Sequence, residues 1–286
     1  MVAQIQIRRI PFDAPWDWLA AGWRDLCSVP QVSLAYGAAF AVLALAIAAG
    51  LLQFGMQSLI LALAGGFLLI GPLVAVGLYE TSWRLETGKP ISLREVAFAG
   101  LKAPGQLGFF GVILTFAFAV WVQLAFLMFM LFMGSRVLPP ANEFVPTLLF
   151  TPHGLGLLVA GTVVGGVLAT IIFSISAISV PLLLTRPVDA VTAMAASVEA
   201  VVKNPKPMAL WAALIASFMA LGTASLFVGL AIAFPLIGHA TWHAFRSLVV
   251  QNEPRGKAPE AGHLIRNFLG AKPGASRPAV VTGTVR

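Results

Sequence analysis

Charged residues are scarce in this chain. Asp, Glu, Lys and Arg make up 10% of its 286 residues, whereas 59% are hydrophobic. An ordinary soluble domain carries about 25% charged residues. The apolar excess is gathered into long runs separated by short polar segments, which is typical of an all-α protein that crosses a membrane several times.

Cysteine is almost absent as well. Cys27 is the only one, which excludes an internal disulfide and a cysteine-ligated metal or iron–sulfur site. The chain also lacks the phosphate-binding loops, the nucleophilic-serine motif and the HExxH zinc motif of common enzymes. No segment between the apolar runs is long enough for a catalytic domain, so we expect a protein that is not an enzyme and has no cofactor.

Six apolar runs predict six membrane-spanning helices, at residues 34–52, 58–79, 107–132, 155–184, 208–222 and 226–245. A helix needs about 20 apolar residues to cross the hydrocarbon core. The fifth run is short by that measure, so fusion of the last two runs into one helix is the alternative. The spans define a domain of residues 34–250, preceded by a cytoplasmic segment with an interfacial helix (1–33) and followed by a basic, disordered tail (251–286).

The basic residues favour six spans over five. With six, every Lys and Arg except Arg136 lies on one side, whereas five would move the basic tail to the other side. The positive-inside rule makes the basic side cytoplasmic, which predicts a multi-pass protein of a bacterial inner membrane with both termini in the cytoplasm. The net charge of +7 then indicates contact with anionic phospholipids of the bilayer rather than with nucleic acid.

The spans also suggest an internal repeat of three hairpins. Each hairpin would begin with an amphipathic cytoplasmic helix and a proline, followed by an odd-numbered span and then an even-numbered span with its own proline. The prolines before the odd spans are Pro30, Pro104 and Pro205, and those in the even spans are Pro72, Pro181 and Pro235. The alternative is that membrane segments resemble one another through composition alone.

Local signals predict where these helices begin and how they pack. Ser92 and Glu95 fit a capping box, and Asp189 is a favourable N-cap residue. Gly161 and Gly165 form a GxxxG pair, which predicts close packing of the fourth span. The even-span prolines indicate tight packing, with helices bent around a cavity as the alternative. Five tryptophans are expected to anchor the chain at the membrane interface: Trp16, Trp18, Trp23, Trp83 and Trp242.

Two histidines near the end of the sixth span are the first candidates for chemistry. His239 and His243 lie one helical turn apart on one face, so they are candidate ligands for a haem or a metal ion. The sequence offers few third ligands, and the favoured interpretation is a polar cytoplasmic rim of Glu80, His239, His243 and Arg246. The repeat aligns Glu80 with His243, and we expect these two side chains to meet. It aligns His239 with Val76, which makes His239 the residue particular to this span.

The other polar residues within the spans are uncharged. They are Gln53, Gln57, Gln123, Thr115, Thr162, Thr170, Ser174, Ser176 and Ser179. Hydroxyl groups in helices commonly bond to carbonyls of their own helix, so we expect them to serve helix structure rather than a substrate. A pathway between the hairpins, as in a small transporter or channel, is the alternative function.

Several stretches resemble the DUF2189 family of predicted bacterial integral membrane proteins. They include GPLVAVGLYETSWRLETGKPIS, SVPLLLTRPVDAVTAMAASVEAVVKNPKPMALWAALI and PLIGHATWHAFRSLV, and the resemblance extends over residues 8–250. Family members are often labelled as similar to cytochrome c oxidase, but four histidines are too few for a haem–copper catalytic subunit. No established activity comes with the family, so the resemblance implies the class and source of the protein more than its mechanism. Our leading hypothesis is a non-catalytic accessory, scaffold or assembly subunit of a larger bioenergetic complex of the respiratory type, in contact with other membrane subunits.

Overall fold

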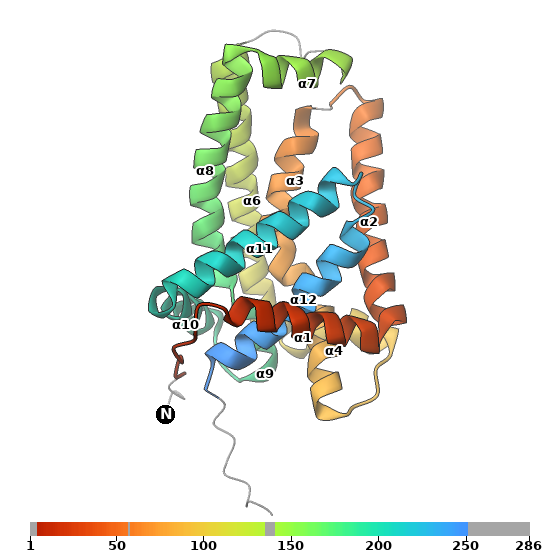
Figure 1. The fold of residues 1–286 in the computed structure, drawn as a ribbon, viewed down its shortest axis with the longest axis vertical. Coiled ribbons are helices and arrows are strands. Elements are labelled where there is room, and N and C mark those ends of the chain that lie inside the picture. Colours follow the sequence, from red (N-terminus) through yellow and green to blue (C-terminus); the bar gives the residue numbers. More distant parts are fainter. Residues whose placement is uncertain (1–4, 57, 135–140, 251–286) are drawn as a thin grey trace, which may run out of the picture. The chain divides into compact units, whose positions relative to one another are not determined.

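The computed structural model describes residues 5–56, 58–134 and 141–250, which are almost entirely helical (Figure 1). The helices in these ranges are α1 (Ala14–Ser28), α2 (Pro30–Gln53), α3 (Ser58–Val74), α4 (Val76–Thr87), α5 (Leu93–Ala97), the 3₁₀ helix η1 (Ala99–Lys102), α6 (Pro104–Met133), α7 (Ala141–Phe150), α8 (Pro152–Ser176), α9 (Ser179–Thr185), α10 (Ala190–Lys203), α11 (Pro205–Ala224) and α12 (Leu230–Leu248). Arg136 and the tail after Val250, both used to predict the topology, lie outside the described residues.

Four helical stretches in the described ranges are long and apolar enough to cross a membrane. They are Pro30–Gln53, Pro104–Met133, Pro152–Thr185 and Pro205–Ala224. The predicted second span is divided into two helices, because the helix is interrupted at Ala75 between α3 and α4. The predicted sixth span corresponds to α12, in which His239, His243 and Arg246 interrupt the apolar sequence. The all-helical prediction is therefore confirmed, with four candidate spans.

Helix α12 lies at the centre of the packing. Most of its residues are buried, and it contacts α1, α2, α4 and α11. Two glycines let neighbouring helices approach it closely: Gly22 of α1 lies against the backbone of Ala240, and Gly37 of α2 lies against the backbone of Ala231. A β-carbon at either glycine would clash with those backbone atoms, so small residues set the helix spacing here.

The short helices lie at the ends of the long ones. Helix α1 crosses α12 at the end where α4, α9 and α10 lie, whereas α7 lies across the opposite end (Figure 1) and packs against α8. The amphipathic helices α1 and α10 are thus found at the same end of the bundle.

Three junctions between a surface helix and a long helix share one backbone conformation. At each junction a single residue leaves the helical region, and a proline then begins the long helix. The φ and ψ angles are −135° and 59° at Val29, −139° and 59° at Ala103, and −129° and 54° at Asn204. A residue before proline is kept out of the α region, and proline suits the first helical position, so each junction follows from its sequence.

The predicted helix starts are confirmed at two sites. The Ser92 Oγ accepts a hydrogen bond from the backbone N–H of Glu95 at the start of α5. The Asp189 carboxylate accepts one from the backbone N–H of Thr192 at the start of α10, at 2.8 Å.

The prolines of the even spans differ from one another. Pro72 lies near the end of α3 and is half-buried, whereas Pro181 and Pro235 are buried. The helix breaks before Pro181, between α8 and α9, but α12 continues through Pro235 without a break.

The segment before α1 is tied to the end of α12 and to the third junction. Ile7 and Val249 form the one β-bridge found in the described ranges. The buried Asn204 side chain joins the same segment: its Oδ1 accepts from the backbone N–H of Ile10 at 2.9 Å, and its Nδ2 donates to the carbonyl of Arg8 at 3.1 Å. Asn204 thus fixes the N-terminal segment against the junction of α10 and α11.

We predict that Asn204→Ala lowers the free energy of unfolding by about 2 kcal/mol, because it leaves the Ile10 N–H and the Arg8 carbonyl without their partner. Denaturant unfolding in detergent, followed by circular dichroism, measures the change. Ser217→Ala is the control, since the Ser217 hydroxyl is exposed and bonds only to its own helix at Ala213. Equal stability of the two variants would contradict the role of Asn204.

Candidate functional site

Five polar side chains meet around α12 and form the histidine cluster. They are Asp25 of α1, Ser33 of α2, Ser82 of α4, and His239 and His243 of α12. The imidazole of His239 lies between two hydroxyls: its Nε2 is 2.9 Å from the Ser33 Oγ, and its Nδ1 is 2.8 Å from the Ser82 Oγ. Ser33, Ser82 and His239 are buried, so this histidine joins three helices in the interior.

Asp25 extends the cluster toward the surface. Its Oδ2 accepts a hydrogen bond from the Ser82 hydroxyl at 2.7 Å and lies 2.9 Å from the His243 Nε2. Burial acts to raise the pKa of Asp25, but hydrogen bonds from His243 and Ser82 outweigh this effect and hold that pKa below its ordinary value of 3.8. The carboxyl group is therefore ionised at neutral pH.

The ionised carboxylate determines the direction of the other hydrogen bonds. It can only accept, so Ser82 gives its proton to Asp25 and accepts in turn from an Nδ1–H of His239. The Nε2 of the neutral imidazole then accepts from the Ser33 hydroxyl. Both ring nitrogens are used within the chain, and a metal or haem iron bound at Nε2 would have to displace Ser33.

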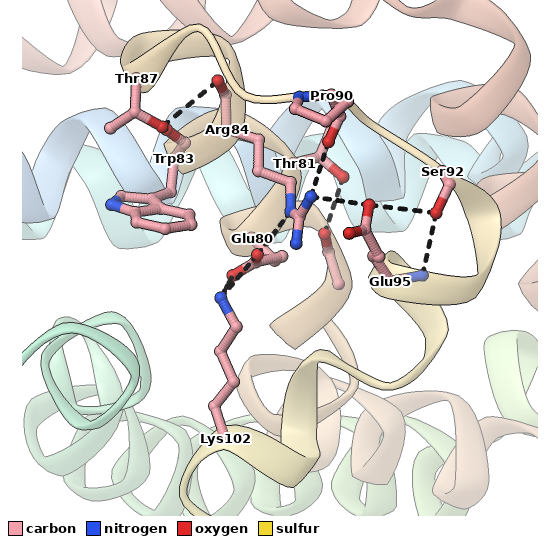
Figure 2. Close-up of polar contacts among 10 residues, drawn as sticks. Glu80, Thr81, Trp83, Arg84, Thr87, Pro90, Ser92, Glu95 and Lys102 are labelled. Carbon is pink, nitrogen blue, oxygen red and sulfur yellow. Dashed lines mark hydrogen bonds and ion pairs between the residues drawn. The ribbon is translucent and has the colours of Figure 1, made fainter.

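A second set of charged side chains, the glutamate cluster, lies where α4 meets α5 and η1 (Figure 2). The carboxylate of Glu80 is 3% exposed; it accepts from the Arg84 Nε at 2.7 Å, and the Lys102 Nζ lies 2.6 Å from both of its oxygens. Arg84 also donates from Nη1 to Glu95 at 2.6 Å. Figure 2 shows the Arg84 guanidinium between Glu80 and Glu95, with Lys102 reaching Glu80 from η1. The buried charge of Glu80 is thereby fully paired.

Trp83 forms one side of this cluster. The ammonium groups of Lys89 and Lys102 lie over its ring, 4.0 Å and 4.4 Å from the ring centre. A small pocket of about 140 Å³ lies between Trp83, Glu80, Lys102 and Trp242. Among the described residues, no group of three His, Cys, Asp or Glu side chains has the spacing to hold a metal ion.

Two large cavities separate the helices elsewhere. The α8–α11 cavity, of about 580 Å³, is bounded by α3, α8, α11 and α12. The α7 cavity, of about 750 Å³, lies between α3, α6 and α8, where Phe144 and Leu148 of α7 form part of its wall. Apolar side chains make up most of the lining of both.

Comparison with known proteins supports the interpretation that this is an integral membrane protein. Residues 59–185 match the model of the DUF2189 family. That family is described as a predicted integral membrane protein. The DUF2189 segment runs from α3 through α9 and contains the whole glutamate cluster, so the family resemblance is confirmed there. It does not reach the stretch at 235–249, and of the histidine cluster it contains Ser82 alone. Comparisons with curated proteins and with solved structures gave no match.

The structure does not join the four residues of the predicted polar rim. Glu80 is bound by Arg84 and Lys102, whereas His243 is bound by Asp25, so the expected contact between Glu80 and His243 is absent. The reason is that α4 turns a different face to α12: Ser82 meets His239, and Glu86 meets Arg246 at 2.5 Å.

Two of the five predicted interfacial tryptophans are buried. Trp18 packs edge-on against Trp211 of α11, with ring centres 5.5 Å apart. Trp242 donates from its indole nitrogen to Glu86 at 3.1 Å. Both therefore connect helices instead of anchoring them at an interface. Trp16 and Trp23 of α1 are exposed, as an anchor at the membrane surface requires.

The two glycines of the GxxxG pair have different surroundings. A β-carbon at Gly165 would clash with the ring of Trp121, whose indole N–H donates to the Ala62 carbonyl at 2.6 Å. Gly161 borders the α7 cavity, and no described atom lies within 4 Å of the place of its β-carbon. Close packing is thus found at Gly165 only.

Three members of the histidine cluster could not be found from the sequence. Asp25, Ser33 and Ser82 lie in three separate helices, and none belongs to a motif with His239. Their association depends on how α1, α2 and α4 pack around α12.

We predict that Asp25→Asn removes part of the pH dependence of stability. The folded protein holds the pKa of Asp25 below its ordinary value, so this carboxylate stabilises the fold at neutral pH and its contribution is lost as pH falls below about 5 toward the folded-state pKa. Unfolding measured at pH 7 and in acid should show a smaller difference for Asp25→Asn than for the wild type. Asp17→Asn, at an exposed position of the same helix, should behave as the wild type; if Asp25→Asn does so too, the interpretation fails.

We also predict that Glu80→Gln costs about 3 kcal/mol of stability, because breaking a buried ion pair leaves charges without compensation. Glu199→Gln is the matched control: Glu199 pairs with Lys203 four residues on, and both side chains are 43% exposed. Exposed pairs contribute about 0–1 kcal/mol. Similar losses in the two variants, measured by denaturant unfolding, would show that the glutamate cluster does not stabilise the fold.

Proposed function

We propose that the protein is a non-catalytic accessory, scaffold or assembly subunit of a larger membrane complex of the respiratory type. The observation that carries this proposal is an exposed face of α6 with an amide at membrane depth. Several hydroxyls of the long helices are used within the chain: those of Thr170, Ser174 and Ser217 donate to carbonyls of their own helices.

Exposed residues follow α6 with the spacing of a helix–helix contact, which we call the α6 stripe. Steps of four and three residues alternate along it, as at the a and d positions of a coiled coil. The stripe consists of Val112, Phe116, Ala119, Gln123, Phe126 and Met130, all of which are exposed. A helix that crosses at a shallow angle makes contact through such a stripe, so the α6 stripe fits a membrane helix of another subunit.

Gln123 is the polar residue of the α6 stripe. It lies ten residues before Met133, the last residue of α6, or about 15 Å along the axis, where the hydrocarbon core is about 30 Å thick. Its amide has no hydrogen-bond partner in the part of the chain that the structure describes, whereas Gln106 of the same helix accepts from the backbone N–H of Ala190 at 2.8 Å.

Lipid chains cannot satisfy the donors and the acceptor of an amide. Glutamine side chains at this depth hydrogen-bond across helices and favour their association. The partner helix would therefore present apolar or small residues along the α6 stripe and an amide or hydroxyl side chain opposite Gln123.

The alternatives are supported less well. The α8–α11 cavity favours a pathway between hairpins, but no described residue in its wall is charged, which suits an apolar occupant and not an ion. A haem or metal at His239 would break its hydrogen bonds to Ser33 and Ser82.

The same proposal includes the membrane topology. Six spans in three repeated hairpins, with both termini in the cytoplasm of a bacterium, agree with the common backbone angles at the three proline junctions. They also agree with the position of α1 and α10 at the end opposite α7. The basic end would then face the anionic phospholipids of the cytoplasmic leaflet.

We predict that Gln123→Leu weakens association with other membrane subunits by about tenfold, since interhelical hydrogen bonds of this kind contribute about 1–2 kcal/mol. The measurement is co-purification from native membranes in a mild detergent, with the bound proteins quantified by mass spectrometry. Ser217→Ala, an exposed position on α11 whose hydroxyl is already bonded, is the control and should retain the partners.

Two results would contradict the proposal. One is wild-type protein that elutes without any other membrane protein. The other is a Gln123→Leu variant that retains its partners as fully as Ser217→Ala does.

A further inference from the structure

The α8–α11 cavity has the form of a site for a hydrocarbon chain. Helices α8 and α11 are both candidate spans, and the cavity separates them. Its interior is formed by buried side chains such as Met208, Trp211 and Met219 of α11, whereas Thr170, Ala209 and Ala216 at its edge are exposed. The cavity therefore opens to the side of the bundle, where acyl chains of the bilayer lie.

The wall of the cavity offers little to a polar ligand. Three of its five hydroxyls, those of Thr170, Ser174 and Thr241, are engaged by carbonyls of their own helices. The other two belong to the buried residues Tyr79 and Ser176. None of the described residues in the lining carries a charge. A lining that is mostly apolar favours an apolar occupant, and a void of about 580 Å³ between membrane helices would forfeit the contacts that close packing provides. The lipid bilayer around these helices supplies acyl chains, which could fill the cavity.

The side chain of a lysine, Lys206, lies at the end of the cavity where the headgroup of such a lipid would be placed. Pro205, the first residue of α11, lines the cavity, and the exposed Lys206 follows it. Lys206 is three residues before Ala209, so the two lie on neighbouring parts of the helix surface. Lys203 is paired with Glu199, but Lys206 has no ion-pair partner in the ranges that the structure describes. A phosphate at this end of the cavity would complement its charge.

We propose that the α8–α11 cavity binds one acyl chain of an anionic phospholipid, with the lipid phosphate at Lys206. The site is separate from the α6 stripe, and its occupancy does not depend on the proposed scaffold function.

The test uses the intact protein in detergent with phosphatidylglycerol that carries bromine on its acyl chains. Bromine quenches indole fluorescence on contact, and Trp211 lines the cavity. We expect saturable quenching, of which the part due to Trp211 is lost in Trp211→Phe. Native mass spectrometry of the washed protein should find one retained phospholipid.

Two variants of neighbouring alanines make the test specific. Ala212 lines the cavity, whereas Ala213 is exposed and does not. Ala212→Phe should fill the cavity and remove both the retained lipid and the quenching of Trp211, while Ala213→Phe should leave both unchanged. Circular dichroism reports whether either variant is misfolded, and the smaller Ala212→Leu replaces Ala212→Phe in that event.

The headgroup is tested separately. Lys206→Gln should weaken binding of phosphatidylglycerol about fivefold, the factor that corresponds to one lysine near a phosphate, and should not change binding of brominated phosphatidylcholine. Equal binding of both lipids to the wild type would overturn the assignment to Lys206. Quenching that does not saturate, or that persists in Ala212→Phe, would overturn the acyl-chain site itself.

Discussion

The buried imidazole of His239 is the contact around which the other helices are arranged. It joins α12 to α2 through Ser33 and to α4 through Ser82, and Ser82 continues the chain to Asp25 of α1. A polar group buried away from water costs free energy unless it is hydrogen-bonded, so each of these helices must keep its position for the others to be satisfied. The glycines at positions 22 and 37 permit this arrangement, because they bring α1 and α2 against the backbone of α12.

The same requirement explains the remaining polar side chains. Glu80 is buried but carries two cationic partners, and Asn204 uses its amide to hold the segment before α1. The hydroxyls of Thr170 and Ser174 donate to carbonyls of their own helix. Gln123 is exposed at membrane depth, in the wall of the α7 cavity, and has no bond to any described residue. The proposed function rests on this exposed amide, whose donors and acceptor a side chain of a partner helix could bind.

Local features of the fold could be predicted from the sequence, and long-range contacts could not. Proline and its preceding residue determine the three junctions, and Ser92 and Asp189 cap their own helices, since all of these effects act within a few residues. The burial of Trp18 and Trp242 depends on the packing of α1, α4 and α11 against α12, for which no local pattern exists. Glu80 lies within α4 and was expected to meet His243, but its partners depend on the path of the chain to Lys102. His239 could be singled out from the sequence as a histidine within an apolar run, whereas its serine partners could not.

Photo-crosslinking in the native membrane tests the central claim, that another protein covers the α6 stripe, most directly. Benzoylphenylalanine would be placed at Ala119, within the stripe, and in a second protein at Val163, an exposed residue of α8 outside it. The account predicts that irradiation joins the label at position 119 to another polypeptide, while the label at position 163 reacts chiefly with lipid. Lipid adducts alone at position 119, at the same yield as at position 163, would contradict it.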